Sequence, residues 1–416
     1  MKISDIKPQV YEMADRAELK IRPVFDQIDR VAAFNTRKVM EAFQDHRVSE
    51  GCFAGTTGYG YDDMGRETLD KIYAQIFKTE AAMVRAQFVN GTHALTCAMF
   101  SLSAPGETVL AVTGTPYDTL RCAIGISGDG YGSLRYYGIG YQQVNLTVAG
   151  EPDYENIRRA ASDPNVTGVM IQRSRGYADR RALTIEDIRQ ICAAVREVNP
   201  GAHIMVDNCY GEFTDLMEPT EVGADLIAGS LIKNPGGGIA PTGGYIAGKQ
   251  ELVERAALRL TTPGIGGECG STLGVNRPFF QGLFFAPHVV AQALKTAVFC
   301  AAMMDELGLE SSPRFDEKRS DIIQMVKLGS AERMKKFCLG IQAGAPVDSY
   351  VTPEPWAMPG YDDEVIMAAG AFIQGSSIEL SADGPMREPY IAYMQGGLTY
   401  ESGKLGVMMA VSAMLS

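Results

Sequence analysis

The sequence predicts an α/β protein with a mostly parallel sheet between layers of helices, followed by a smaller α+β domain. Short apolar runs alternate with helical stretches from about residue 80 to residue 250, as in parallel sheets that are covered on both faces. The length of 416 residues allows two or three domains at roughly 150 residues each. We place an N-terminal helical arm at 1–55, a large domain at 56–310 and a small domain at 311–416.

The elements are predicted from hydrophobic periodicity. Residues 3–46 have apolar positions at helical spacing with charges between them, so we expect amphipathic helices that pack on the small domain or on a partner subunit. Buried strands are expected at 84–89, 108–112, 168–172, 204–207, 226–230 and 244–247. Helical stretches at 93–101 and 185–198 separate some of these strands.

The C-terminal third begins with a loop. Residues 261–274 are rich in glycine and small side chains, which is typical of a plain connector or of a mobile cover over a site. A long apolar helix is expected at 279–307. The segment 311–320 contains proline and is interpreted as the hinge into the small domain. A helix of small residues at 403–415 ends the chain.

Composition excludes several classes of protein. The net charge of −12 has the wrong sign for a nucleic-acid binder, and no apolar run reaches the roughly 18 residues of a membrane span. Eight scattered cysteines indicate reduced thiols, and four distant histidines give no reason to expect a metal site. The first residues lack a signal-peptide core, so we expect a cytoplasmic protein that binds neither nucleic acid nor membrane.

Two opposite charges follow two of the expected strands. Asp207 ends one strand, and Lys233 comes just after the next. The carboxyl ends of parallel strands meet at one edge of the sheet, where ligands collect. Taken singly, Lys233 is interpreted as a solvated surface lysine and Asp207 as a turn residue. As a pair they meet the needs of pyridoxal phosphate, which requires a Schiff-base lysine and an acid beside its ring nitrogen.

The cofactor phosphate would need an anion site. Asn90, Gly91 and Thr92 lie between a strand and a helix, where free backbone N–H groups can bind an anion; the alternative is a simple turn with Thr92 as helix cap. Residues 243–249 nearly match a nucleotide-binding P-loop, but Gln250 stands where a hydroxyl is needed and the interior is strand-like. Residues 264–267 lack a complete dinucleotide pattern.

Several motifs resemble a known family. VDNCYGEF (206–213), SLIK (230–233) and TGTPYDTL (113–120) resemble fold type I pyridoxal phosphate enzymes of the cystathionine and methionine lyase branch. GYGYDDMGRETLD (58–70), QFVNGTHAL (87–95), SLIKNPGGGIAPTGGYIAGK (230–249) and ELSADGPMREPY (379–390) resemble the methionine gamma-lyase-like aluminium resistance proteins. The resemblance covers about residues 50–400. It implies a seven-stranded sheet and a homodimer or homotetramer with active sites at subunit interfaces.

The resemblance implies roles for individual residues. Lys233 would hold the cofactor, Asp207 would bind its ring nitrogen and Tyr117 would stack on its ring and assist the leaving group. The phosphate would be held by Gly91, Thr92 and Ser230, with Tyr61 and Arg66 supplied by a neighbouring subunit, although the Tyr-to-Arg spacing differs from the family pattern. Arg387 would bind the substrate carboxylate. Arg173 and Arg175 stand where the branch usually has Asn-Pro, and both are expected to face the same edge and bind an acidic group.

The predicted function is a carbon–sulfur lyase that acts by beta or gamma elimination on a sulfur-containing amino acid such as cystathionine or methionine. Two alternatives stay open. Another fold type I enzyme, an aminotransferase or an aldolase, would share Lys233, Asp207 and Arg387. A pyridoxal phosphate-binding regulator without turnover would also need the cofactor site, but no attached DNA-binding segment is visible in the sequence.

Overall fold

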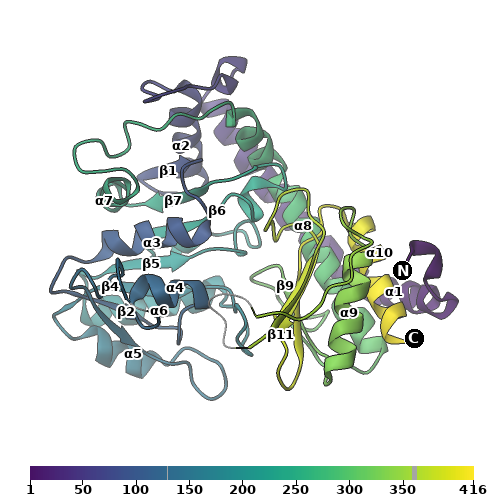
Figure 1. Cartoon of the computed structure of the whole chain (residues 1–416). Helices are drawn as coiled ribbons and strands as arrows, with labels where there is room; N and C mark the ends of the chain where they lie inside the picture. Colours follow the sequence, from purple (N-terminus) through teal and green to yellow (C-terminus); the bar gives the residue numbers. More distant parts are fainter. Residues whose placement is uncertain (129, 358–362) are drawn as a thin grey trace.

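The large sheet has the predicted α/β architecture. The computed structural model describes residues 1–128, 130–357 and 363–416. A seven-stranded sheet has the strand order β1-β7-β6-β5-β4-β2-β3 and is parallel from β6 to β3, whereas β7 runs antiparallel to both of its neighbours. Helices cover this sheet, and a second, antiparallel sheet lies beside it (Figure 1). The predicted fold class is therefore confirmed.

The elements have the following bounds. The strands of the large sheet are β1 (Ala81–Arg85), β2 (Thr108–Ala111), β3 (Gly140–Gln143), β4 (Val166–Gln172), β5 (His203–Asp207), β6 (Leu226–Ser230) and β7 (Gly244–Gly248). The helices up to the end of this sheet's domain are α1 (Pro8–Asp45), α2 (Met64–Ile76), α3 (Gly91–Leu102), α4 (Asp118–Ile124), α5 (Tyr154–Ala161), α6 (Ile185–Val198), α7 (Gln250–Leu260) and α8 (Asn276–Glu306). Short 3-10 turns are η1 (Ile3–Asp5), η2 (Glu50–Phe53), η3 (Pro219–Val222) and η4 (Asn234–Gly236).

Two strands differ from the sequence prediction. The first strand is β1, at 81–85 rather than at 84–89, because its antiparallel pairing with β7 ends at Arg85. Val89 is then 75% exposed in the loop that leads to α3. Strand β3 was missed, since its sequence GYQQ is polar and it lies at the edge of the sheet, where only one neighbour is needed.

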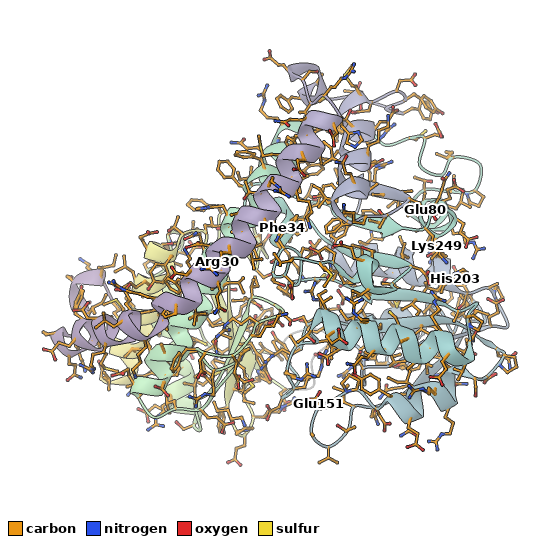
Figure 2. The ribbon with its side chains drawn as sticks, turned by 180° about the vertical axis from the view of Figure 1, so that it is seen from behind. Arg30, Phe34, Glu80, Glu151, His203 and Lys249 are labelled. Carbon is orange, nitrogen blue, oxygen red and sulfur yellow. The ribbon has the colours of Figure 1, made fainter. Side chains whose placement is uncertain are left out.

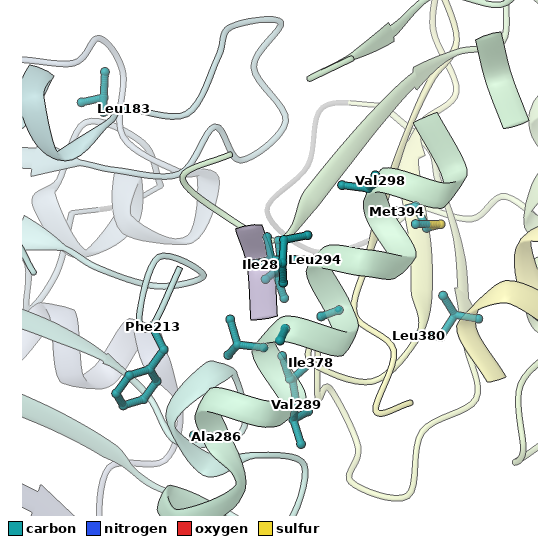
Figure 3. Packing of buried hydrophobic residues seen from close by; sticks show 14 of the residues in the cluster. Ile28, Leu183, Phe213, Ala286, Val289, Leu294, Val298, Ile378, Leu380 and Met394 are labelled. Atoms are coloured by element: carbon teal, nitrogen blue, oxygen red, sulfur yellow. The ribbon is translucent and has the colours of Figure 1, made fainter. Parts of the chain in front are cut away.

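Helix α8 is the centre of the core between the two sheets. Among the described residues, it alone is long and apolar enough to cross a membrane, but 78% of its most apolar window is buried inside the protein. Figure 3 shows Leu294 of α8 beside Ile28 of α1, and Val289 and Val298 of α8 near Ile378 and Met394 of the small domain; all belong to one buried cluster. The long apolar run predicted at 279–307 is thus a core helix.

The N-terminal arm is one continuous helix rather than several. Helix α1 runs across the back of the molecule from the small domain to the large one, with Arg30 and Phe34 on its length (Figure 2). Its apolar side packs on α8, and it also contacts α2 and the C-terminal helix α10 (Tyr400–Met414). This placement agrees with an arm that packs on the small domain, while the exact domain limits stay a prediction.

The small domain carries the antiparallel sheet, in the strand order β10-β11-β12-β9-β8. Its elements are β8 (Ser311–Ser312), β9 (Ile323–Lys327), α9 (Ala331–Ala343), β10 (Val365–Ala369), β11 (Ser381–Pro385), β12 (Ile391–Gln395) and α10. A cluster of Ile323, Met325, Ile391 and Tyr393 on this sheet packs against Tyr177 and Tyr210 of the large domain. The two sheets therefore meet at the carboxyl ends of β4 and β5.

Candidate active site

Two adjoining cavities lie where the sheets meet. The inner cavity has a volume of about 110 Å³, and its wall includes Asp207 and Lys233 from the large domain and Asp383 from the small domain. The outer cavity has a volume of about 540 Å³ and opens beside it. Both cavities are lined by Tyr117, Gln172, Gly176 and Tyr177. The inner cavity is the candidate reaction site because it holds the predicted lysine and acid.

The structure brings Lys233 and Asp207 together. Asp207 is the last residue of β5, and Lys233 follows the neighbouring strand β6 by three residues. The Lys233 Nζ lies 4.1 Å from the centre of the Tyr210 ring. Burial disfavours the ammonium form, yet the pKa of Lys233 is raised because anionic forms of Cys209, Tyr210, Asp207 and Glu212 attract its charge.

Asp207 is a buried carboxyl at the end of β5. Its Oδ1 accepts the backbone N–H of Cys209 at 3.1 Å. Burial raises the pKa of Asp207, while Lys233 and the Cys209 hydrogen bond act in the opposite direction. A positively charged ligand atom in the inner cavity would favour the ionised form of this carboxyl.

An anion cradle forms at the start of α3. Gly91 and Thr92 are the first residues of this helix, whose N-terminal N–H groups favour an anion. A Cβ at Gly91 would lie 3.2 Å from Ser230 Cβ, a tight contact, so glycine lets the helix start close to the end of β6 without displacing Ser230. The Ser230 side chain is fully buried, and its Oγ has no hydrogen-bond partner among the described residues. Thr92 Oγ1 lies 2.8 Å from Thr119 Oγ1.

Tyr117 also lines the inner cavity, directly before α4. Its backbone N–H donates to Gln172 Oε1 at 2.8 Å, which fixes the loop after β2 to the end of β4. The ring of Tyr117 lies edge-on to Tyr177, with centroids 6.1 Å apart. The predicted aromatic residue is thus in the cavity together with Lys233 and Asp207.

The three arginines considered for acidic groups have different environments. Arg387 lies in the β11–β12 connection at the outer cavity, where its side chain is 57% exposed and its Nη1 pairs with Asp363 at 2.8 Å. Arg175 lines the same cavity but is 1% exposed. Its Nη2 donates to Ser312 Oγ at 3.2 Å, while Nε and Nη1 have no partner among the described residues.

Arg173 does not face the cavities, which corrects the prediction that both cations point to the edge. Its side chain is fully buried under the sheet and lines neither cavity. The guanidinium donates to Asn208 Oδ1 at 2.7 Å and to Thr214 Oγ1 at 3.2 Å, and lies 3.6 Å from Glu218 Oε2. Residues two apart in an extended segment point to the same side, but different segments can pack around them. Arg173 is paired in the interior, whereas Arg175 lies at the cavity.

Tyr61 and Arg66 lie away from the cavity of their own chain. Tyr61 is 58% exposed and stacks on Tyr59. Arg66 is 3% exposed, and its guanidinium donates to the carbonyl groups of Gly60, Gly270 and Glu268. These hydrogen bonds tie the glycine-rich loop at 261–274 to residues 58–66 within one chain. The expected role of Arg66 at the phosphate site of a neighbouring subunit stays a prediction.

The sequence reasoning missed several residues of the inner cavity. Tyr210 lies three positions after Asp207 in a quoted motif, so its proximity to the lysine could have been suspected. Asp383 lies in the quoted motif 379–390, from which only Arg387 was chosen. Tyr393 and Gln395 carried no signal in the sequence. All three small-domain residues reach the cavity only because the two sheets meet.

Known proteins similar to this chain share most of its length. The model of the methionine gamma-lyase family matches residues 10–415. The uncharacterized protein YnbB of Bacillus subtilis is 48% identical over 403 residues, which cover 97% of this chain and 96% of YnbB. A carbon-sulfur lyase involved in aluminum resistance from Clostridium novyi NT has a crystal structure with a TM-score of 0.95 and 53% identity, covering 98% of this chain and 96% of that one. The pyridoxal-5'-phosphate dependent protein YhfS from Escherichia coli shares the fold, with a TM-score of 0.62 at 16% identity over 92% of this chain and 95% of that one.

Proposed function

Because the chain belongs to the methionine gamma-lyase family, as its motifs predicted, we propose that it is a pyridoxal phosphate-dependent carbon–sulfur lyase acting on a sulfur-containing amino acid. The observation that carries the proposal is the convergence of Lys233 and Asp207 from adjacent strand ends on one cavity. Elimination at the beta or the gamma carbon would release a thiol, ammonia and an oxoacid from cystathionine-like or methionine-like substrates.

The residues that line the inner cavity, together with Ser230 beside Gly91, fit the cofactor. The buried Ser230 hydroxyl without a partner and the open start of α3 at Gly91 offer hydrogen-bond donors for a phosphate. Thr92 would add its hydroxyl, and Tyr117 would cover the ring. When bound, pyridoxal phosphate supplies an electron sink beside the substrate amine.

Lys233 and Asp207 would carry the proton chemistry. The Lys233 amine would bind the cofactor and, once released by the substrate, would take the alpha proton as a general base. Asp207 would keep a proton on the ring nitrogen. Its burial makes the isolated carboxylate unfavourable, so an adjacent cation would stabilise the ionised acid and the protonated ring together.

The substrate carboxylate is better matched by Arg175 than by Arg387. A buried guanidinium with unpaired N–H groups gains more from a carboxylate than an exposed one, because water no longer competes for the hydrogen bonds. Arg175 has two such nitrogens beside the outer cavity, whereas Arg387 is already paired with Asp363 and largely exposed. We therefore place the amino acid between Lys233 and Arg175, with Arg387 at the cavity mouth.

Tyr61 would reach the cofactor of a second subunit. Tyr59, Tyr61 and Leu273 are exposed and lie on two loops held together by backbone hydrogen bonds between Gly270 and Tyr59 and between Leu273 and Thr56. Exposed aromatic and apolar groups of this kind favour a protein interface. A homodimer or homotetramer in the cytoplasm, with sites completed across the interface, fits this arrangement.

The proposal is tested with the purified protein and its Lys233→Ala variant. We expect the wild type to bind added pyridoxal phosphate with a Schiff-base absorbance that borohydride traps, and the variant to lack it. A wild type that takes up no cofactor would refute the proposal. Assays with cystathionine, cystine and methionine then distinguish the lyase from an aminotransferase, since a lyase forms thiol, ammonia and oxoacid without a second amine acceptor.

A further inference from the structure

A carboxyl side chain lies beside the apolar cluster where the two sheets meet. Asp383 of β11 pairs in register with Tyr393 of β12, which in turn pairs with Met325 of β9. Tyr393 belongs to the buried cluster that packs on Tyr177 and Tyr210. An apolar residue would satisfy this packing at lower cost, because burial of a carboxyl is unfavourable unless its hydrogen bonds are made. The acid therefore requires an explanation beyond packing.

The Asp383 carboxyl is incompletely paired. The residue is 8% exposed. Its Oδ2 accepts a long hydrogen bond of 3.4 Å from Gln395 Nε2, and its side chain is also hydrogen-bonded to Tyr177. The other oxygen, Oδ1, is buried without a partner among the described residues. A buried oxygen without a partner points to a ligand that this cavity accepts.

Asp383 reaches the inner cavity from the small domain. It lines the inner cavity together with Lys233 and Asp207, but it comes from the small domain, whereas those two come from the large sheet. A substrate held at Lys233 would lie between the two domains. Its side chain would then extend toward the wall that contains Asp383 and Tyr177.

Burial lets this carboxyl keep a proton near neutral pH, so that it can act as a proton donor. It raises the pKa of Asp383 to about 7, against a smaller effect of the Tyr177 hydrogen bond. Tyr177, Lys233 and Asp207 line the same cavity as this carboxyl. Burial raises the pKa values of Tyr393 and Cys338 beside it, so both are uncharged at neutral pH. A thiol has an ordinary pKa of about 8.5 and a phenol one of about 10. Proton transfer to a departing thiolate is thus favourable from Asp383 and unfavourable from an ordinary tyrosine.

We propose that Asp383 is a catalytic residue that protonates the departing sulfur, an assignment that rests on the proposed lyase function. As the carbon–sulfur bond breaks, its electron pair passes to sulfur. The Asp383 carboxyl gives its proton to that sulfur, which leaves as a neutral thiol, and the resulting carboxylate regains a proton from water before the next turnover. Tyr117 then serves to hold the ring and shape the cavity.

The test compares two leaving groups in the holoenzyme. Asp383→Asn keeps the shape of the side chain but cannot donate an acidic proton. With cystathionine we expect kcat/KM of this variant to fall by about a hundredfold. With beta-chloroalanine, whose chloride leaves without a proton, we expect a change below about threefold. Ser381→Ala is the control: Ser381 lies two residues away on the same strand, is buried and does not line the inner cavity, so both rates should stay at the wild-type level.

Other outcomes overturn the assignment or the function separately. Equal losses with both substrates, or no loss with either, would refute Asp383 as the acid. A wild type that turns over neither of these substrates, nor cystine, nor methionine, would instead refute the proposed function. The pH profile adds a second criterion, since the wild-type decline in cystathionine turnover above about pH 7 should disappear in the variant. Cofactor absorbance verifies the fold of the variant, and if it is lost, Asp383→Ser is measured with the same two substrates and judged by the same criteria.

Discussion

The buried Asp383 carboxyl also leads us to predict how the stability of the protein depends on pH, and this prediction needs no cofactor and no substrate. A carboxyl with a pKa of about 7 in the folded protein and about 3.9 in the unfolded chain binds more protons when folded. Its contribution to stability is therefore complete below about pH 4 and is lost as the pH rises toward 7. Asp383→Asn removes this titration, so the variant should gain stability over the wild type as the pH rises.

The magnitude follows from the two pKa values. The whole effect is on the order of 4 kcal/mol, and between pH 5.5 and pH 8.5 the stability difference between variant and wild type should grow by about 2 kcal/mol. Urea unfolding of the cofactor-free proteins, followed by circular dichroism at several pH values, measures it. Buried Glu212, whose pKa is raised to about 8 mainly by burial, titrates in both proteins and cancels in the comparison.

Parallel pH profiles for the variant and the wild type would refute this reasoning. They would mean that the Asp383 carboxyl is ionised in the folded protein, paired with a cation or hydrated. Ser381→Ala, on the same strand, provides the matched control and should follow the wild type at every pH. The prediction concerns the cofactor-free chain alone, so it can hold or fail whatever reaction the protein catalyses.

Three further substitutions test other parts of the site. Gly91→Ala should fold normally but bind pyridoxal phosphate about tenfold more weakly, because its Cβ would press on Ser230 in the anion cradle; unchanged affinity in a cofactor titration would contradict the cradle. Arg175→Met should lower kcat/KM about tenfold or more through a higher KM, while Arg387→Met should change it less than threefold; the reverse order would restore Arg387 as the carboxylate ligand. Arg173→Met should reduce the free energy of unfolding by about 3 kcal/mol or more, because a buried carboxylate loses its partner; a change below 1 kcal/mol in urea unfolding would count against that role.

The sequence alone was enough for the fold class and for the centre of the site. Alternation of strands and helices predicted the sheet, because strands covered on both faces must be apolar throughout. Asp207 and Lys233 could be paired in advance because Asp207 ends one central strand and Lys233 follows its neighbour, and parallel strands end on the same side. Helix α6 has the predicted bounds 185–198, since hydrophobic periodicity is a local feature of the sequence.

Features that depend on distant partners were decided by the tertiary structure. The polar edge strand β3 is a strand only because β2 pairs with it, and β1 begins and ends where β7 offers backbone partners. Arg173 and Arg175 are two residues apart and look alike in the sequence. One meets Glu218 inside the protein and the other borders a cavity, and that difference is set by which segments pack around them.

The chemical properties of Asp383 also could not be predicted from the sequence. In the sequence it is one acid in a motif, 150 positions from Lys233. Its burial, its unpaired oxygen and its raised pKa arise only when the small sheet packs against the large domain and removes water from the contact. Local patterns therefore determined the elements and the strand-end residues, whereas the electrostatic character of the site came from the burial that only the packed domains create.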